Sequence, residues 1–76
     1  MQVHPLIETS AALVEFCKLI ENSDFIAVDT EFMRENTFWP ELCLIQVADS
    51  EHAAAIDPMA KDMDLKPLLD LSLIHI

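Results

Sequence analysis

The sequence has 76 residues, of which 14 are acidic and 4 are basic, so its formal net charge is -10 at pH 7. Apolar residues make up 53% of the chain, which excludes an ordinary disordered acidic tail because such tails are poor in apolar residues. No apolar run reaches the roughly 18 residues of a membrane-spanning helix. The stretch Met1–Pro5 also lacks the basic and apolar regions of a secretory signal, so we expect a cytoplasmic protein.

The two cysteines, Cys17 and Cys43, are expected to be reduced, since nothing in the sequence marks the chain for export. Free cysteines are among the most buried residue types, so two buried apolar thiols are the simplest interpretation. A zinc site that combines them with two of His4, His52 and His75 is an alternative, although these spacings match no known zinc pattern.

A helix is predicted over Ser10–Glu21. Thr9 or Ser10 can cap its first turn by accepting a hydrogen bond from a free backbone N–H. Its apolar residues recur at the i, i+3, i+4, i+7 spacing that puts them on one helical face. They are Leu13, Phe16, Cys17 and Ile20.

Three strands are predicted next, over Phe25–Val28, Leu42–Val47 and His52–Ile56. The first is continuously apolar, which is typical of a strand covered on both faces. The second follows Pro40, a residue that is tolerated at the start of a strand. Gln46 is expected to be a satisfied polar group within that second strand. Short connections between successive strands favour an antiparallel meander.

A second helix is predicted over Leu65–Leu71. Asp64 can cap it, and Pro67 falls in the first turn, where proline is tolerated. The chain is therefore expected to have an α/β fold with the order helix, three-stranded antiparallel meander, helix.

The most informative feature for function is the acid pair Asp29 and Glu31, which follows directly on the apolar strand Phe25–Val28. Residues two apart on a strand point to the same side, so both carboxylates are expected to project together, away from Val28 and Thr30. Adjacent buried carboxylates repel each other unless a proton or a cation neutralises them. Carboxylate oxygens are the ligands that Mg²⁺ takes, so the pair is a candidate half of a metal site. The alternative is that the two acids simply mark the solvated end of a strand.

The segments around the acid pair resemble the amino-terminal part of the ribonuclease D family, 3'-5' exonucleases of the DEDD superfamily with a ribonuclease-H-like fold. Asp29-Thr30-Glu31-Phe32 looks like the first exonuclease motif of that family, and Phe38–Leu42 with Leu44–Val47 looks like its second strand. His52–Pro58 looks like the third strand and its exit. The resemblance covers residues 6–70 and depends on the order and spacing of these segments.

The resemblance implies that Asp29 and Glu31 are catalytic metal ligands for two divalent ions, Mg²⁺ or Mn²⁺. The implied reaction is in-line attack of water on the terminal phosphodiester of RNA, with release of nucleoside 5'-monophosphates; the implied substrates are tRNA precursors. Thr30, Phe32 and Arg34 are the candidate substrate-binding residues, with Phe32 stacking on a base and Arg34 contacting phosphate. Core packing of Phe32 and a solvated loop position for Arg34 remain alternatives.

The sequence departs from the family in two ways. The superfamily uses four acids, and this chain can supply only the first two, so we expect residues 1–76 to be an incomplete, inactive amino-terminal portion of the exonuclease domain. The apolar end at residues 71–76 is either native or a junction sequence at the end of a gene fragment. A different class of function is a small acidic module that binds a protein or a cation without catalysis. Uncovered apolar faces also favour self-association of the isolated chain.

Overall fold

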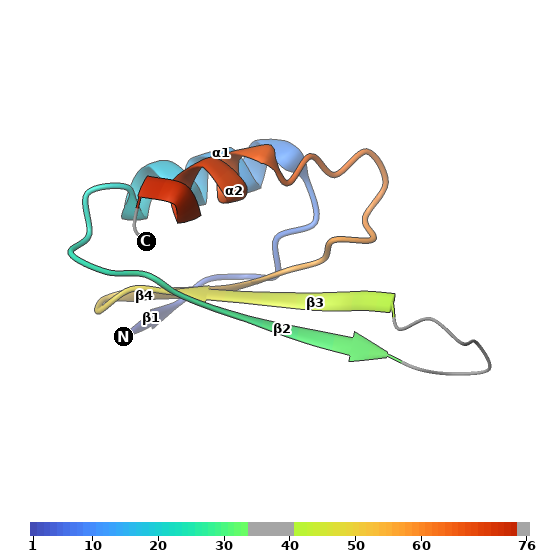
Figure 1. Cartoon of the computed structure of the whole chain (residues 1–76), viewed down its shortest axis with the longest axis horizontal. Coiled ribbons are helices and arrows are strands. Elements are labelled where there is room, and N and C mark those ends of the chain that lie inside the picture. Colours follow the sequence, from blue (N-terminus) through green and yellow to red (C-terminus); the bar gives the residue numbers. More distant parts are fainter. Residues whose placement is uncertain (34–40, 75–76) are drawn as a thin grey trace.

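The computed structural model describes residues 1–33 and 41–74, with side chains described for residues 1–31 and 43–72. The element order is β1 (Gln2–Val3), α1 (Ser10–Ile20), β2 (Ala27–Met33), β3 (Glu41–Ala48), β4 (His52–Ile56) and α2 (Lys66–Ile74). The strands form one sheet with the order β1-β4-β3-β2. Both helices lie on the same side of this sheet (Figure 1), so the predicted α/β class is confirmed. Within the described ranges no helix is long and apolar enough to cross a membrane.

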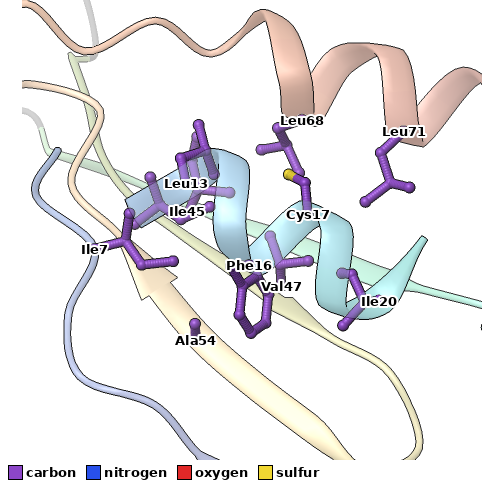
Figure 2. Packing of buried hydrophobic residues seen from close by; sticks show 11 residues of the cluster. Ile7, Leu13, Phe16, Cys17, Ile20, Ile45, Val47, Ala54, Leu68 and Leu71 are labelled. Carbon is purple, nitrogen blue, oxygen red and sulfur yellow. The ribbon is translucent and has the colours of Figure 1, made fainter. Parts of the chain in front are cut away.

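Helix α1 forms as its sequence predicts and ends one residue earlier, at Ile20. Thr9 caps it, because its hydroxyl accepts a hydrogen bond from the N–H of Ala12 at 3.1 Å, one of the donors that a helix start leaves unpaired. The predicted apolar face of α1 is buried. Figure 2 shows this face meeting side chains from α2 and from the sheet in one cluster.

The sheet contains the predicted antiparallel meander and one strand that the sequence analysis missed. Strand β3 pairs antiparallel with β2 on one side and with β4 on the other. Strand β1 adds to the far edge of β4 in parallel, through hydrogen bonds from Gln2 N–H to Glu51 O at 2.7 Å and from His4 N–H to Ala53 O at 2.8 Å. A two-residue strand has no periodicity of its own, so only this pairing reveals it.

The first predicted strand is present, but its predicted bounds, Phe25–Val28, and its predicted cover on both faces are wrong. The strand β2 begins at Ala27 and runs to Met33, so the acid pair lies inside it rather than after its end. Phe25 is 54% exposed and Val28 is 45% exposed. The physical reason is position: β2 is the outer strand of the described sheet, and the helices pack over β3 and β4 instead.

Helix α2 begins at Lys66 and continues to Ile74, so the predicted bounds Leu65–Leu71 are one residue early at the start and three short at the end. Asp64 supports the helix start as expected, with its Oδ1 accepting from the N–H of Lys66 at 3.0 Å. Leu68 and Leu71 are buried in the core, and this burial favours continuation of the helix through that region.

The turn between β3 and β4 is organised by Asp49, a buried carboxylate. Its Oδ1 accepts from the N–H groups of Glu51 at 2.8 Å and His52 at 2.6 Å, and its Oδ2 accepts from the Ser23 hydroxyl. The Ser23 hydrogen bond is the main cause that holds the pKa of Asp49 below its ordinary value. Asp49 therefore ties the turn after α1 to the turn between two strands.

The expectation of two buried thiols is confirmed for Cys17 but not fully for Cys43. Both are free thiols; Cys17 is buried in the core and Cys43 is half-buried, and burial raises the pKa of Cys17. No group of three side chains able to bind a metal is present among the residues that the structure describes, so the zinc alternative finds no support there. His75 lies outside the described residues.

Replacing Asp49 by alanine is expected to lower the midpoint of thermal unfolding of the chain by several degrees at pH 7, because two N–H groups and the Ser23 hydroxyl lose their acceptor. A carboxyl whose pKa is lowered by folding stabilises the protein at high pH, and this contribution disappears as the pH falls through the folded pKa. The difference between wild type and Asp49→Ala should therefore shrink below about pH 4. Thermal unfolding followed by circular dichroism over this pH range measures it.

The matched control is Asp24→Ala, which removes the same charge from an exposed position in the neighbouring turn. If Asp49→Ala unfolds at the same temperature as this control, Asp49 does not organise the turn.

Candidate functional site: an acid pair on the open face of the sheet

Asp29 and Glu31 lie on the face of the sheet that the helices leave open. Opposite residues of an antiparallel pair share a face. Asp29 pairs with Gln46 and Glu31 with Leu44, whereas Thr30 pairs with Ile45. Ile45 is buried in the core beneath the helices, so the acids are on the opposite face, as their spacing predicts. Both acids are exposed.

Beside Asp29 the open face forms a shallow hollow of about 340 Å³. Its floor consists mainly of small side chains from β2, β3 and β4. These include Ala27, Ala48, Ala53 and Ala55. Short side chains keep the floor low, so a flat ligand group or a packing element could approach the carboxylate closely.

The carboxylate of Asp29 is held by its own strand. Its Oδ1 accepts a hydrogen bond from the N–H of Thr30 at 2.9 Å. An ionised carboxylate has about four acceptor sites, so this one hydrogen bond does not exhaust its capacity to bind a cation. The structure therefore places the main chain of Thr30 beside the acids. The side chain of Thr30 lies on the other face of the sheet, the one that carries the helices.

An irregularity in pairing follows Glu31. The register shifts between Glu31 and Phe32, so that Phe32 pairs with Leu42 and Cys43 is the extra residue of β3. The Cys43 thiol donates to the Glu31 carbonyl at 3.3 Å. Such bulges increase the local twist and re-aim the side chains that follow.

Two predicted substrate-binding residues cannot be placed against the acids by their side chains. Phe32 is a residue of β2, but its side chain lies outside the described ones. Arg34 lies wholly outside the described residues, as do Trp39 and Pro40.

Two features were missed by sequence reasoning. Gln46, expected to be a satisfied polar group inside an apolar strand, is exposed directly across from Asp29. His4 and His52 form a pair, with 3.0 Å between His4 Nε2 and His52 Nδ1. No local pattern indicates either arrangement, because both depend on strand pairing: Gln46 on the register of β2 and β3, and the histidines on β1 joining β4.

The electrostatic setting of Asp29 and Glu31 differs from that of Asp49. Asp49 accepts hydrogen bonds from three donors. The acid pair carries two exposed charges on one face, and among the residues that the structure describes its one donor is the Thr30 N–H. Exposed hard oxygen ligands on a rigid strand suit a divalent cation. Chemically, the arrangement can supply two ligands and no more from the described residues.

Comparison with known proteins identifies the family to which the chain belongs. A family model described as a 3'-5' exonuclease matches residues 5–75. The chain is 65% identical to the ribonuclease D of Sphingobium indicum over 71 residues, which cover 93% of the chain and 18% of the relative. It is 61% identical to the ribonuclease D of Zymomonas mobilis, with the same coverage. The chain therefore spans less than a fifth of the length of these relatives.

Solved structures resemble the fold as well. The crystal structure of Escherichia coli RNase D, described as an exoribonuclease involved in structured RNA processing, matches with a TM-score of 0.80 and 41% identity over 93% of this chain and 18% of that one. The EXO domain of Aedes aegypti Nibbler matches with a TM-score of 0.77 at 19% identity, covering 96% of this chain and 33% of that one. The second match bears on the fold alone.

The acid pair is expected to be neutral or unfavourable for stability. Same-face neighbours on a strand are about 6.5–7 Å apart, and two exposed charges at that distance repel by about 0.6 kcal/mol in water. Asp29→Asn keeps an acceptor for the Thr30 N–H and removes one charge. We therefore expect the free energy of unfolding of the chain to stay constant or to rise by up to this amount at low salt. Urea unfolding measures the change, and a fall of more than about 1 kcal/mol would instead give Asp29 a structural role.

Proposed function

Because the chain belongs to the 3'-5' exonuclease family, we propose that it is the amino-terminal part of the catalytic domain of a metal-dependent 3'-5' exoribonuclease. The observation that carries the proposal is the acid pair Asp29 and Glu31, exposed together on the open face of the sheet. The ribonuclease D relatives support RNA as the substrate. The chain alone is proposed to be inactive, since it provides only two of the acids that such a site needs.

The residues present fit a divalent cation as one part of its ligand set. Both acids offer hard oxygen atoms, and β2 holds them on one face. No third side chain able to bind a metal joins them among the described residues. When bound, Mg²⁺ or Mn²⁺ would supply an activated water and stabilise the charge that develops on the phosphate oxygens.

The chain's own contributions are binding and orientation. The N–H of Thr30 fixes Oδ1 of Asp29, which is the main-chain role that we assign to Thr30. Glu31, two residues further along β2, provides a second carboxylate on the same face. We propose that Phe32 and Arg34, which follow in sequence, contact the base and the phosphate of the terminal nucleotide.

The proposed substrates are RNA 3' ends, including those of tRNA precursors, trimmed to nucleoside 5'-monophosphates in the cytoplasm. The processing of structured RNA that is described for the Escherichia coli enzyme supports this class of substrate. A net charge of -10 repels a polyanion, so binding needs the cations at the acid pair and basic surface supplied from elsewhere.

Self-association is proposed for the isolated chain. Val3 is 75% exposed, Phe25 54% and Val28 45%, and exposed apolar surface of this kind favours association. Sedimentation equilibrium should show an average mass that rises with protein concentration. The double variant Phe25→Ser, Val28→Thr should shift that rise to higher concentration, whereas Met59→Gln, a change at an exposed position in a loop, should not. A mass that stays monomeric at all concentrations would contradict the proposal.

The catalytic proposal is tested in a chimera in which this chain replaces the matching segment of the ribonuclease D of Sphingobium indicum. The unmutated chimera should shorten a 5'-labelled single-stranded RNA from its 3' end in the presence of Mg²⁺. Asp29→Asn and Glu31→Gln should each lower kcat by more than about 100-fold, beyond the 10–100-fold typical of residues that only support a metal ligand.

The matched control is Asp24→Asn, an exposed acid outside the sheet, which should retain full activity. If Asp29→Asn and Glu31→Gln also retain activity within a few-fold, the acid pair is not catalytic. The interpretation as an acidic binding module without catalysis would then take precedence.

A further inference from the structure

Gln46 occupies the position across the strands from Asp29. The two residues are register partners in the β2–β3 pair, and both line the hollow on the open face. Gln46 is exposed, whereas its sequence neighbours Ile45 and Val47 are buried in the core. Alternation along β3 therefore directs the amide of Gln46 to the same side of the sheet as the acid pair.

Nothing bulky separates Gln46 from Asp29 on the open face. The next register positions along and across the sheet are alanines, with Ala27 opposite Ala48 and Ala55 opposite Gln46. Directly opposite residues have Cβ atoms about 4.5–5.5 Å apart, a distance that a glutamine side chain spans. Glu31, in contrast, lies opposite Leu44, which offers no hydrogen bond.

The chemistry of an amide suits a supporting role for a carboxylate that binds a cation. Its nitrogen carries two donors, so it can hold one oxygen of Asp29 while the carboxylate keeps its charge and its free lone pairs. A lysine in the same place would compete with the cation, whereas a glutamine orients the ligand without opposing charge. Partners of this kind fix the direction of metal ligands and tune metal affinity.

We propose that Gln46 is a positioning residue: when a divalent cation is bound, its amide donates a hydrogen bond to the Asp29 carboxylate and orients it toward the cation. The inference rests on the proposed function, in which Asp29 is a metal ligand. It adds to that function a residue on a second strand, which makes the β2–β3 register part of the site.

The test uses the same chimera and the variant Gln46→Met, which keeps the length of the side chain and removes its donors. The dissociation constant of Mn²⁺, measured by isothermal titration calorimetry without RNA, and the Mn²⁺ concentration that gives half-maximal exonuclease activity should both rise 10–100-fold. KM for RNA and kcat at saturating Mn²⁺ should stay within a few-fold. Gln46→Asn, which keeps the amide on a shorter stem, should recover part of the loss. The control is Gln2→Met, the same change at an exposed position on β1, at the edge of the sheet away from β2. It should leave both the Mn²⁺ dependence and the activity unchanged.

Each other outcome overturns the inference in a recognisable way. An unchanged Mn²⁺ requirement shows that Gln46 does not orient Asp29. A raised KM for RNA at an unchanged Mn²⁺ requirement makes Gln46 a substrate contact instead. A lower thermal midpoint as the only effect makes it structural. Full activity of Asp29→Asn would show that the proposed function itself has failed.

Discussion

The packing of two helices against one face of the sheet is the constraint on which the site depends. Ile45 and Val47 of β3 and Ile56 of β4 are buried against the helices, and strand geometry then sends alternate residues to the other side. The pairing of β2 with β3 extends the same two faces to the outer strand. Asp29 and Glu31 are exposed together because core residues such as Ile45 fix the register.

The fold also places two carboxylates, Asp49 and Asp29, in different settings. Asp49 is buried at a turn, and three donors satisfy it, so its charge stabilises local structure. Asp29 is exposed, and within the described part of the chain its carboxylate has one donor, the N–H of Thr30. A charge that the fold does not satisfy remains available for binding, and this difference is what separates a structural acid from a candidate metal ligand.

Local sequence patterns predicted much of the fold. Thr9 and the apolar spacing from Leu13 to Ile20 fixed α1 because a cap and a face are both local properties. The strand over His52–Ile56 was predicted with its observed bounds. The prediction for β2 was wrong in its bounds and its burial, because an apolar run indicates a strand but does not tell whether that strand lies at the edge of the sheet.

Only those features of the site that depend on a single strand could be predicted from the sequence. The shared direction of Asp29 and Glu31 follows from their spacing, and the resemblance of the surrounding segments to ribonuclease D gave the family. The place of Gln46 beside Asp29 and the pairing of His4 with His52 depend on how strands join. Such pairings are set by tertiary packing, which no local window of sequence contains.

The most direct test of the account is a crystal structure of the ribonuclease D chimera soaked with Mn²⁺, with the metal located by its anomalous scattering. The account predicts a Mn²⁺ ion on the open face, with carboxylate oxygens of Asp29 and Glu31 in its coordination sphere at about 2.1–2.2 Å, close to the distance for Mg²⁺. Mn²⁺ bound elsewhere in the domain, with both carboxylates directed to solvent, would contradict it.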